Sequence, residues 1–153
     1  MDILIILLVV ALAIAPLTNF LPSKRQRAVA RLREYAAVHG LFVEFRDLPG
    51  SEQSRIGEAQ RPEQIIYYGI RLPPSRGEPR PRQAWLATGE GWRGVGHRAP
   101  EPACTAQLPA EILALSREET SCGIYWKEPG GEAEVQQIVD ALKSWREAMQ
   151  GSG

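Results

Sequence analysis

The residues of this chain whose types suit thiol chemistry or transition-metal binding are few: Cys104, Cys122, His39 and His97. A cysteine nucleophile needs a neighbouring base and a lowered thiol pKa. For Cys122, only His97 is a plausible base, whereas a buried structural cysteine is the commoner use of this residue type. The cysteines and histidines do not have zinc-ligand spacing. We therefore predict no metal site, no cofactor and no catalytic residues, with a thiol enzyme that uses Cys122 as a minor alternative.

Residues 89–94 match the glycine pattern Gly-x-Gly-x-x-Gly of phosphate-binding loops. Such a loop needs a strand before it and a helix start after it, so that backbone N–H groups meet the anion. Here His97 and Pro100 follow, which is no helix start. The segments 84–88 and 91–95 instead resemble two strands around the turn at Gly89 and Glu90, which predicts a β-hairpin.

Aromatic residues gather on the predicted strands, namely Trp85, Trp92, Trp126 and Tyr125. Aromatic rings on a sheet can form a platform for a ligand or a partner. They also dominate the cores of small domains, and we expect core packing to be their main use. A ligand or partner surface at these four residues is the alternative prediction.

The first 21 residues are strongly apolar, and residues 3–21 contain no charged side chain. As a helix this stretch would span about 28 Å, close to the hydrocarbon thickness of a bilayer. Asp2 before it and Pro16 within it disfavour a cleaved signal peptide, which remains the alternative. We therefore predict an uncleaved transmembrane anchor. Its residues include Ile3, Leu4, Leu7, Leu8, Leu12, Pro16, Phe20 and Leu21.

Charge is distributed unevenly behind the apolar stretch. Residues 22–40 carry five basic side chains and one acid, and residues 41–153 carry 13 basic and 16 acidic side chains. Positive charge beside an anchor favours the cytoplasmic side, so we predict an N-terminus outside the membrane and a cytoplasmic domain. In a bacterial cell this membrane would be the inner membrane. The acidic balance of the domain argues against nucleic-acid binding. The residues predicted to set topology and contact lipid headgroups are Lys24, Arg25, Arg27, Arg31 and Arg33.

Hydrophobic periodicity predicts an α+β fold. We expect a transmembrane helix at 1–21, a basic amphipathic juxtamembrane helix within 22–40, a soluble α+β domain at 41–149 and a flexible tail at 150–153. The domain would hold a small antiparallel sheet of about four to five strands with a C-terminal helix packed on one face. The expected strands are 41–48, 65–72, 84–88, 91–95 and 121–127, and the expected helices of the domain are 109–115 and 132–149.

The strings at residues 21–27 (Leu-Pro-Ser-Lys-Arg-Gln-Arg) and 40–46 (Gly-Leu-Phe-Val-Glu-Phe-Arg) resemble a group of small, uncharacterised proteobacterial inner-membrane proteins. The resemblance covers most of the chain and implies a single-pass membrane protein without a known activity. The anchor and basic segment are also superficially similar to the small translocon accessory subunit YajC. The glycine-rich strand motif expected soon after the basic segment of YajC is absent here.

Together these observations predict a non-enzymatic, membrane-anchored accessory or scaffold subunit of an inner-membrane complex. Its expected partners are membrane lipids and a membrane protein. A membrane-tethered ligand-binding or regulatory domain is the alternative function. The sequence does not identify the ligand, the partner or the order of the strands.

Overall fold

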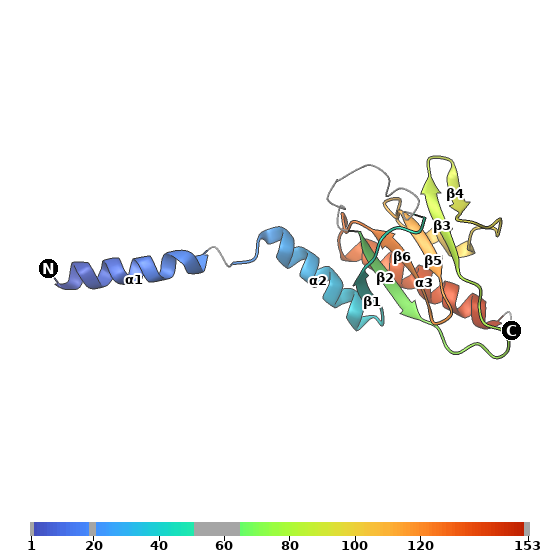
Figure 1. The fold of residues 1–153 in the computed structure, drawn as a ribbon, viewed down its shortest axis with the longest axis horizontal. Coiled ribbons are helices and arrows are strands. Elements are labelled where there is room, and N and C mark those ends of the chain that lie inside the picture. The colour runs from blue at the N-terminus through green and yellow to red at the C-terminus, as the bar shows by residue number, and fades with distance from the viewer. Residues whose placement is uncertain (1, 19–20, 51–64, 152–153) are drawn as a thin grey trace. The chain divides into compact units, whose positions relative to one another are not determined.

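The computed structural model describes residues 2–18, 21–50 and 65–151 (Figure 1). Contacts between Cα atoms divide the chain into two units, Met1–Arg31 and Leu32–Gly153.

The helix α1 (Asp2–Thr18) consists almost wholly of aliphatic residues. Its 17 residues rise about 26 Å. Within the described residues, no helix combines the length and the apolar character that crossing a membrane requires. This finding overturns the predicted transmembrane anchor at 1–21, and with it the predicted single-pass topology and inner-membrane location.

The residues assigned to that anchor lie along α1 or just after it. Pro16 falls within α1, Leu21 follows the helix, and Phe20 lies outside the described residues. The aliphatic side chains along α1 are well exposed: Ile3, Leu4, Leu7, Leu8 and Leu12.

The helix α2 (Lys24–Val38) begins and ends as its sequence predicts. The Ser23 hydroxyl accepts a hydrogen bond from the Gln26 backbone N–H, and the Gln26 side chain accepts one from the Ser23 backbone N–H. This reciprocal pair is a capping box, which satisfies two backbone donors at the start of the helix. Gly40 follows α2 with a φ of +89°, the left-handed conformation that commonly ends a helix.

Six strands among the described residues form one antiparallel sheet in the order β1-β2-β6-β5-β3-β4. Their bounds are β1 Phe42–Phe45, β2 Ile66–Arg71, β3 Gln83–Thr88, β4 Gly91–Gly94, β5 Ala114–Arg117 and β6 Ser121–Trp126. The helix α3 (Glu132–Gly151) covers one face of the sheet (Figure 1). The domain is therefore α+β. Its last strand in sequence, β6, lies inside the sheet between β2 and β5.

The sheet has one strand more than the predicted range, because residues 109–115 do not form the predicted helix. A 3₁₀ helix, η2 (Ala103–Gln107), precedes this segment, and β5 begins at Ala114. Leu115 pairs with Trp85 of β3 on one side and with Ile124 of β6 on the other. Pairing with two neighbours outweighs the helix propensity of a short Ala-Leu-Glu segment.

The core is built on both faces of the sheet. Against α3, the buried stripe Val135, Ile138, Val139, Leu142 and Trp145 packs on the side chains of the inner strands. On the other face, Tyr67, Tyr125 and Ala114 form a smaller cluster. The ring of Tyr67 lies 4.9 Å from that of Tyr125, centroid to centroid. In this arrangement the end of α3 lies beside β5, η2 and the loop before β3.

A buried ion pair ties the second half of α2 to the sheet. Arg33 donates two hydrogen bonds to the Glu128 carboxylate, at 2.8 and 2.7 Å. The Tyr68 hydroxyl donates a third, at 2.7 Å. Hydrogen bonding to Glu128 is the main reason that the pKa of Arg33 is raised. Because Glu128 is buried with these partners, the connection between α2 and the sheet is specific in geometry.

Candidate functional site

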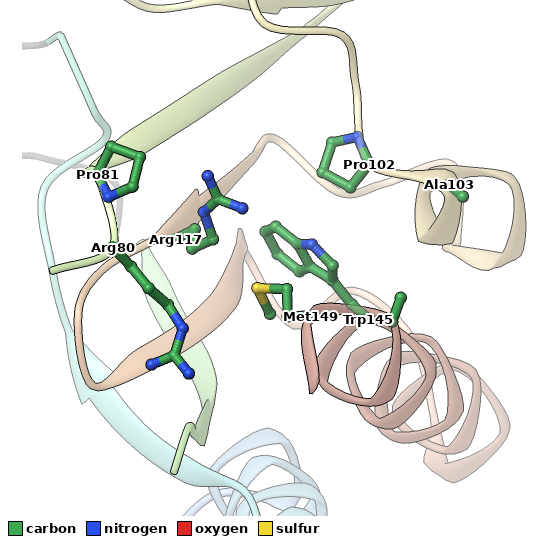
Figure 2. Close-up of a pocket in the computed structure, with 8 residues that line it drawn as sticks. Arg80, Pro81, Pro102, Ala103, Arg117, Trp145 and Met149 are labelled. Carbon is green, nitrogen blue, oxygen red and sulfur yellow. The ribbon is translucent and has the colours of Figure 1, made fainter. Parts of the chain in front are cut away.

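A hollow of about 360 Å³ opens where the last turns of α3 approach β5, η2 and the loop before β3. This site is called the arginine pocket. It is lined by Arg80, Pro81, Pro102, Ala103, Arg117, Trp145, Ala148 and Met149. Figure 2 shows the two arginines entering from the strands and the loop, with Trp145 and Met149 entering from α3. The size is at the lower end of the range of small-ligand sites.

Arg117 is the last residue of β5, and its guanidinium is only partly satisfied. Its Nη2 donates a hydrogen bond to Oε1 of Gln83 on the neighbouring strand. Its Nε is buried and has no hydrogen-bond partner among the described residues. The pKa of Arg117 is lowered, first by burial and then by the positive charge of Arg80. Within the described part of the chain, no carboxylate is among the groups that shift this pKa.

Arg80 is the second cation of the pocket, and backbone carbonyls hold it in place. Its Nη1 donates hydrogen bonds to the carbonyl oxygens of Pro73 and Glu119, both at 2.9 Å. The Glu119 carboxylate accepts a hydrogen bond from Ser75 and another from the Arg80 backbone N–H. The Ser75 bond and the nearby Arg80 lower the pKa of Glu119. Arg80 therefore has a nearby acid, which distinguishes it from Arg117.

The remaining wall of the pocket is apolar. Trp145 is 6% exposed, and its ring centroid lies 6.0 Å from that of Trp85 at a steep angle. Met149 follows one turn later on α3, and its thioether can adapt to ligands of different shape. Two prolines complete this wall. The pocket thus combines positive charge with a surface that favours an apolar or aromatic group.

The two thiols are buried near these arginines and are not activated. Cys122 and Cys104 are free cysteines. Burial, followed by the neighbouring Cys104, raises the pKa of Cys122 to about 12, although Arg146, Arg117 and Arg80 act in the opposite direction. Burial also raises the pKa of Cys104 to about 12. These values are the opposite of what a cysteine nucleophile needs.

His97, the base considered for Cys122, is bound to the backbone instead. Its Nε2 lies 2.9 Å from the Ala84 carbonyl oxygen, and its Nδ1 accepts a hydrogen bond from the Ala99 N–H at 3.1 Å. The imidazole packs against Trp85 with the ring centroids 5.0 Å apart. Both ring nitrogens are therefore engaged in holding the loop after β4.

The residues that the sequence singles out as an aromatic surface lie in the packed interior. Trp85, Trp126 and Tyr125 are buried, and half-buried Trp92 packs against the main core. Residues 89–94 form the turn and the second strand of the β3–β4 hairpin, in which Thr88 pairs with Gly91. The structure thus uses these segments for packing and for a turn, not for a phosphate loop.

The predicted lipid-contacting residues fall into two groups. Lys24, Arg25, Arg27 and Arg31 are exposed on α2. Arg33 is instead engaged with Glu128 inside the domain. In the described ranges, no cluster of three or more His, Cys, Asp or Glu side chains could hold a metal ion.

A larger hollow of about 670 Å³ lies on the sheet face opposite α3. Ser116 and Tyr125 contribute hydroxyl groups to it, with their oxygens 3.4 Å apart. Arg82 and Arg117 line it together with the acidic residues Asp47 and Glu118. Because its charges are mixed, this hollow indicates a ligand type less clearly than the arginine pocket does.

The sequence alone does not group the residues of the arginine pocket. Its periodicity assigns Trp145 and Met149 to the buried stripe of the last helix, and its composition assigns Arg80 to an extended loop. Arg117 lies two residues after the core residue Leu115 on β5, so both side chains point to the α3 face. The sequence does contain one sign of the pocket, which is a charged residue on the same strand face as core residues. This sign can be recognised only after residues 114–117 have been identified as a strand.

Comparison of the chain with protein-family models, with curated proteins and with solved structures finds no match.

Proposed function

We propose that this chain is a non-enzymatic binding subunit, and that the arginine pocket holds the anionic group of its ligand or partner. The observation that carries the proposal is the Arg117 guanidinium, whose Nε is buried beside a second arginine without a hydrogen-bond partner in the described residues. This proposal retains the accessory-subunit and ligand-binding interpretations of the sequence. It does not include the predicted transmembrane anchor.

The physical argument rests on the cost of burying an unpaired cation. A buried donor without a partner costs about 1–3 kcal/mol, and more when it is charged. A carboxylate or phosphate group offers oxygens that match the donors of a guanidinium, and hydrogen bonds between such charged groups are about twice as strong as neutral ones. The neighbouring Trp145 and Met149 would hold an apolar or aromatic part of the same ligand. Binding would thus satisfy a group that the fold by itself leaves unsatisfied.

The chemistry of the site favours binding over catalysis. The thiols near the pocket are protonated at neutral pH, because their pKa values are about 12. Arginine cannot act as a general acid or base near neutral pH. Among the described residues, the lining of the pocket contains no histidine, carboxylate or hydroxyl side chain. These groups can hold an anion, but they supply no proton-transfer or nucleophilic step.

The test is a binding titration of the full chain with two small aromatic anions, benzoate and phenyl phosphate. Calorimetry or the fluorescence of the buried tryptophans would report occupancy. We expect saturable binding of at least one anion, and a loss of at least tenfold in affinity for Arg117→Gln, since a charge-assisted hydrogen bond is worth about 1.5–3 kcal/mol.

Arg98→Gln is the matched control, because it removes the same charge from an exposed position outside the pocket. Its affinity should stay within about twofold of the unchanged protein, since an isolated surface charge contributes little. Absence of binding by both anions, or an equal loss in the two variants, would overturn the proposed function.

A further inference from the structure

A second hollow adjoins the arginine pocket and shares two of its lining residues. It has a volume of about 450 Å³ and is lined by Pro73, Pro74, Arg76, Arg80, Met149 and Gln150. We call it the proline hollow. Because Arg80 and Met149 line both hollows, the two are adjacent parts of one surface.

Arg80 is fixed between the hollows rather than free to swing. Its Nη1 is held by the carbonyl oxygens of Pro73, in the loop after β2, and Glu119, in the turn between β5 and β6. Its backbone N–H is held by the Glu119 carboxylate. A guanidinium held in this way can present its remaining donors to a ligand with little loss of side-chain entropy.

Both hollows are lined by charged and apolar groups together. Arg117 lies in the arginine pocket, Arg80 lies at the shared wall, and Arg76 lies in the proline hollow. The apolar lining consists of Trp145 and Met149 in the first hollow, and of Pro73 and Pro74 in the second. A ligand that fits this lining has at least two anionic groups and an apolar part, a combination that an acidic peptide with an apolar side chain offers.

Nucleic acid would fit this surface less well. Single strands bind through successive bases that stack on several aromatic rings, whereas Trp145 is the one aromatic ring among the described lining residues of the two hollows. Residues 41–153 also carry more acidic than basic side chains, so the domain lacks the broad positive face that polyanions need. Positive charge is concentrated locally, which suits a short acidic segment.

We infer that an acidic segment of a partner protein lies across both hollows, with one carboxylate on Arg117 and a later one near Arg76. This inference rests on the proposed function of the arginine pocket. It adds the class of ligand, an extended acidic peptide, and the second half of its binding site.

The experiment compares two probes on the full chain by calorimetry. One is phenyl phosphate, which can occupy only one hollow. The other is a blocked hexapeptide of five glutamates with phenylalanine at the third position. We expect the peptide to bind at least tenfold more tightly, because it can engage both hollows at once. Replacing its glutamates by glutamines should remove this advantage.

The variant Arg76→Gln separates the two proposals. It should weaken peptide binding about threefold to fivefold, the range of an exposed ion pair, and leave phenyl phosphate unchanged. Arg117→Gln should weaken both probes, and Arg98→Gln should weaken neither. Thermal unfolding of each variant would verify that the fold is retained, and Arg76, being exposed, should be replaceable without loss of stability.

Each outcome bears on one proposal. If phenyl phosphate binds and depends on Arg117, but the peptide binds no more tightly or ignores Arg76→Gln, the peptide inference fails and the proposed function stands. If neither probe depends on Arg117, the proposed function fails. Tight binding of the glutamine peptide would also contradict the inference, because it would mean that the carboxylates are not recognised.

Discussion

At the scale of single residues, Arg117 is placed where a folded chain rarely puts a cation. Its side chain lies on the same face of β5 as that of Leu115, the face toward α3. The neighbouring positive charge of Arg80 repels its own positive charge and lowers its pKa. Natural proteins accept such local costs mainly at functional sites, where binding removes them. This residue therefore links the stability of the domain to the proposed function.

Arg117→Met should make the protein without ligand slightly more stable. The substitution keeps an unbranched side chain of similar length and removes a partly buried, unpaired charge. It also removes the hydrogen bond to Gln83, so the net gain is small, about 0.5–1 kcal/mol. Urea unfolding without ligand measures the free energy of unfolding. A clear loss of stability would show that Arg117 is a structural residue, and the binding proposal would lose its main support.

At the scale of elements, strongly patterned segments are predictable from the sequence and one weakly patterned segment is not. The Ser23–Gln26 capping box, the hairpin at Gly89 and the last helix all rest on local signals. Residues 109–115 carry no such local signal for a strand. The strand β5 is instead stabilised by pairing with β3 and β6, which are distant or later in the sequence. Since Arg117 belongs to β5, missing this strand also conceals the arginine pocket.

The central strands depend on close contact between two glycines and an aromatic ring. Gly69 and Gly123 pair across β2 and β6, and a Cβ atom on either residue would lie 2.5 Å from ring carbons of Tyr67. Both glycines therefore leave room for Tyr67 to lie flat across the sheet. This contact makes the second core cluster dependent on small residues that no hydrophobic pattern would mark.

Gly123→Ala should lower the free energy of unfolding by about 1–3 kcal/mol, the usual cost of overpacking a core. Denaturant unfolding monitored by circular dichroism would measure it. Gly89→Ala is the matched control, because an added Cβ meets nothing within 4 Å at that turn position, and its effect should stay within about 0.5 kcal/mol. Equal effects of the two substitutions would show that Tyr67 does not need the space.

At the scale of the whole molecule, the buried thiols and tyrosine hydroxyls should make the free energy of unfolding decrease at alkaline pH. Burial raises the pKa values of Cys104 and Cys122 from 9.0 to about 12, and it also raises the pKa values of Tyr67 and Tyr68. These groups stay protonated in the folded state at a pH where the unfolded chain has lost the protons. The stability that they contribute is therefore present below pH 9 and lost between pH 9 and 12.

The free energy of unfolding should accordingly be nearly constant from about pH 7 to 8.5 and fall above about pH 9, by up to about 1.4 kcal/mol per pH unit for each thiol. Urea unfolding at a series of pH values measures this slope. The double variant Cys104→Ala, Cys122→Ala should show a shallower slope, with a remainder that comes from the buried tyrosines. An unchanged slope would mean that the thiols are already accessible to solvent in the folded state.

The position of β6 has a consequence for how the protein is made. This strand separates β2 from β5 in the sheet, yet it is the last of the sheet's strands to leave the ribosome. At roughly 5–20 residues per second, residues 72–120 take about 2 to 10 seconds to synthesise. During that time β2 lacks its inner neighbour, and Ile66, Tyr68 and Ile70 lack their cover. The sheet can therefore be completed only after residues 121–126 have emerged, and until then the uncovered apolar face of β2 favours aggregation of the nascent chain.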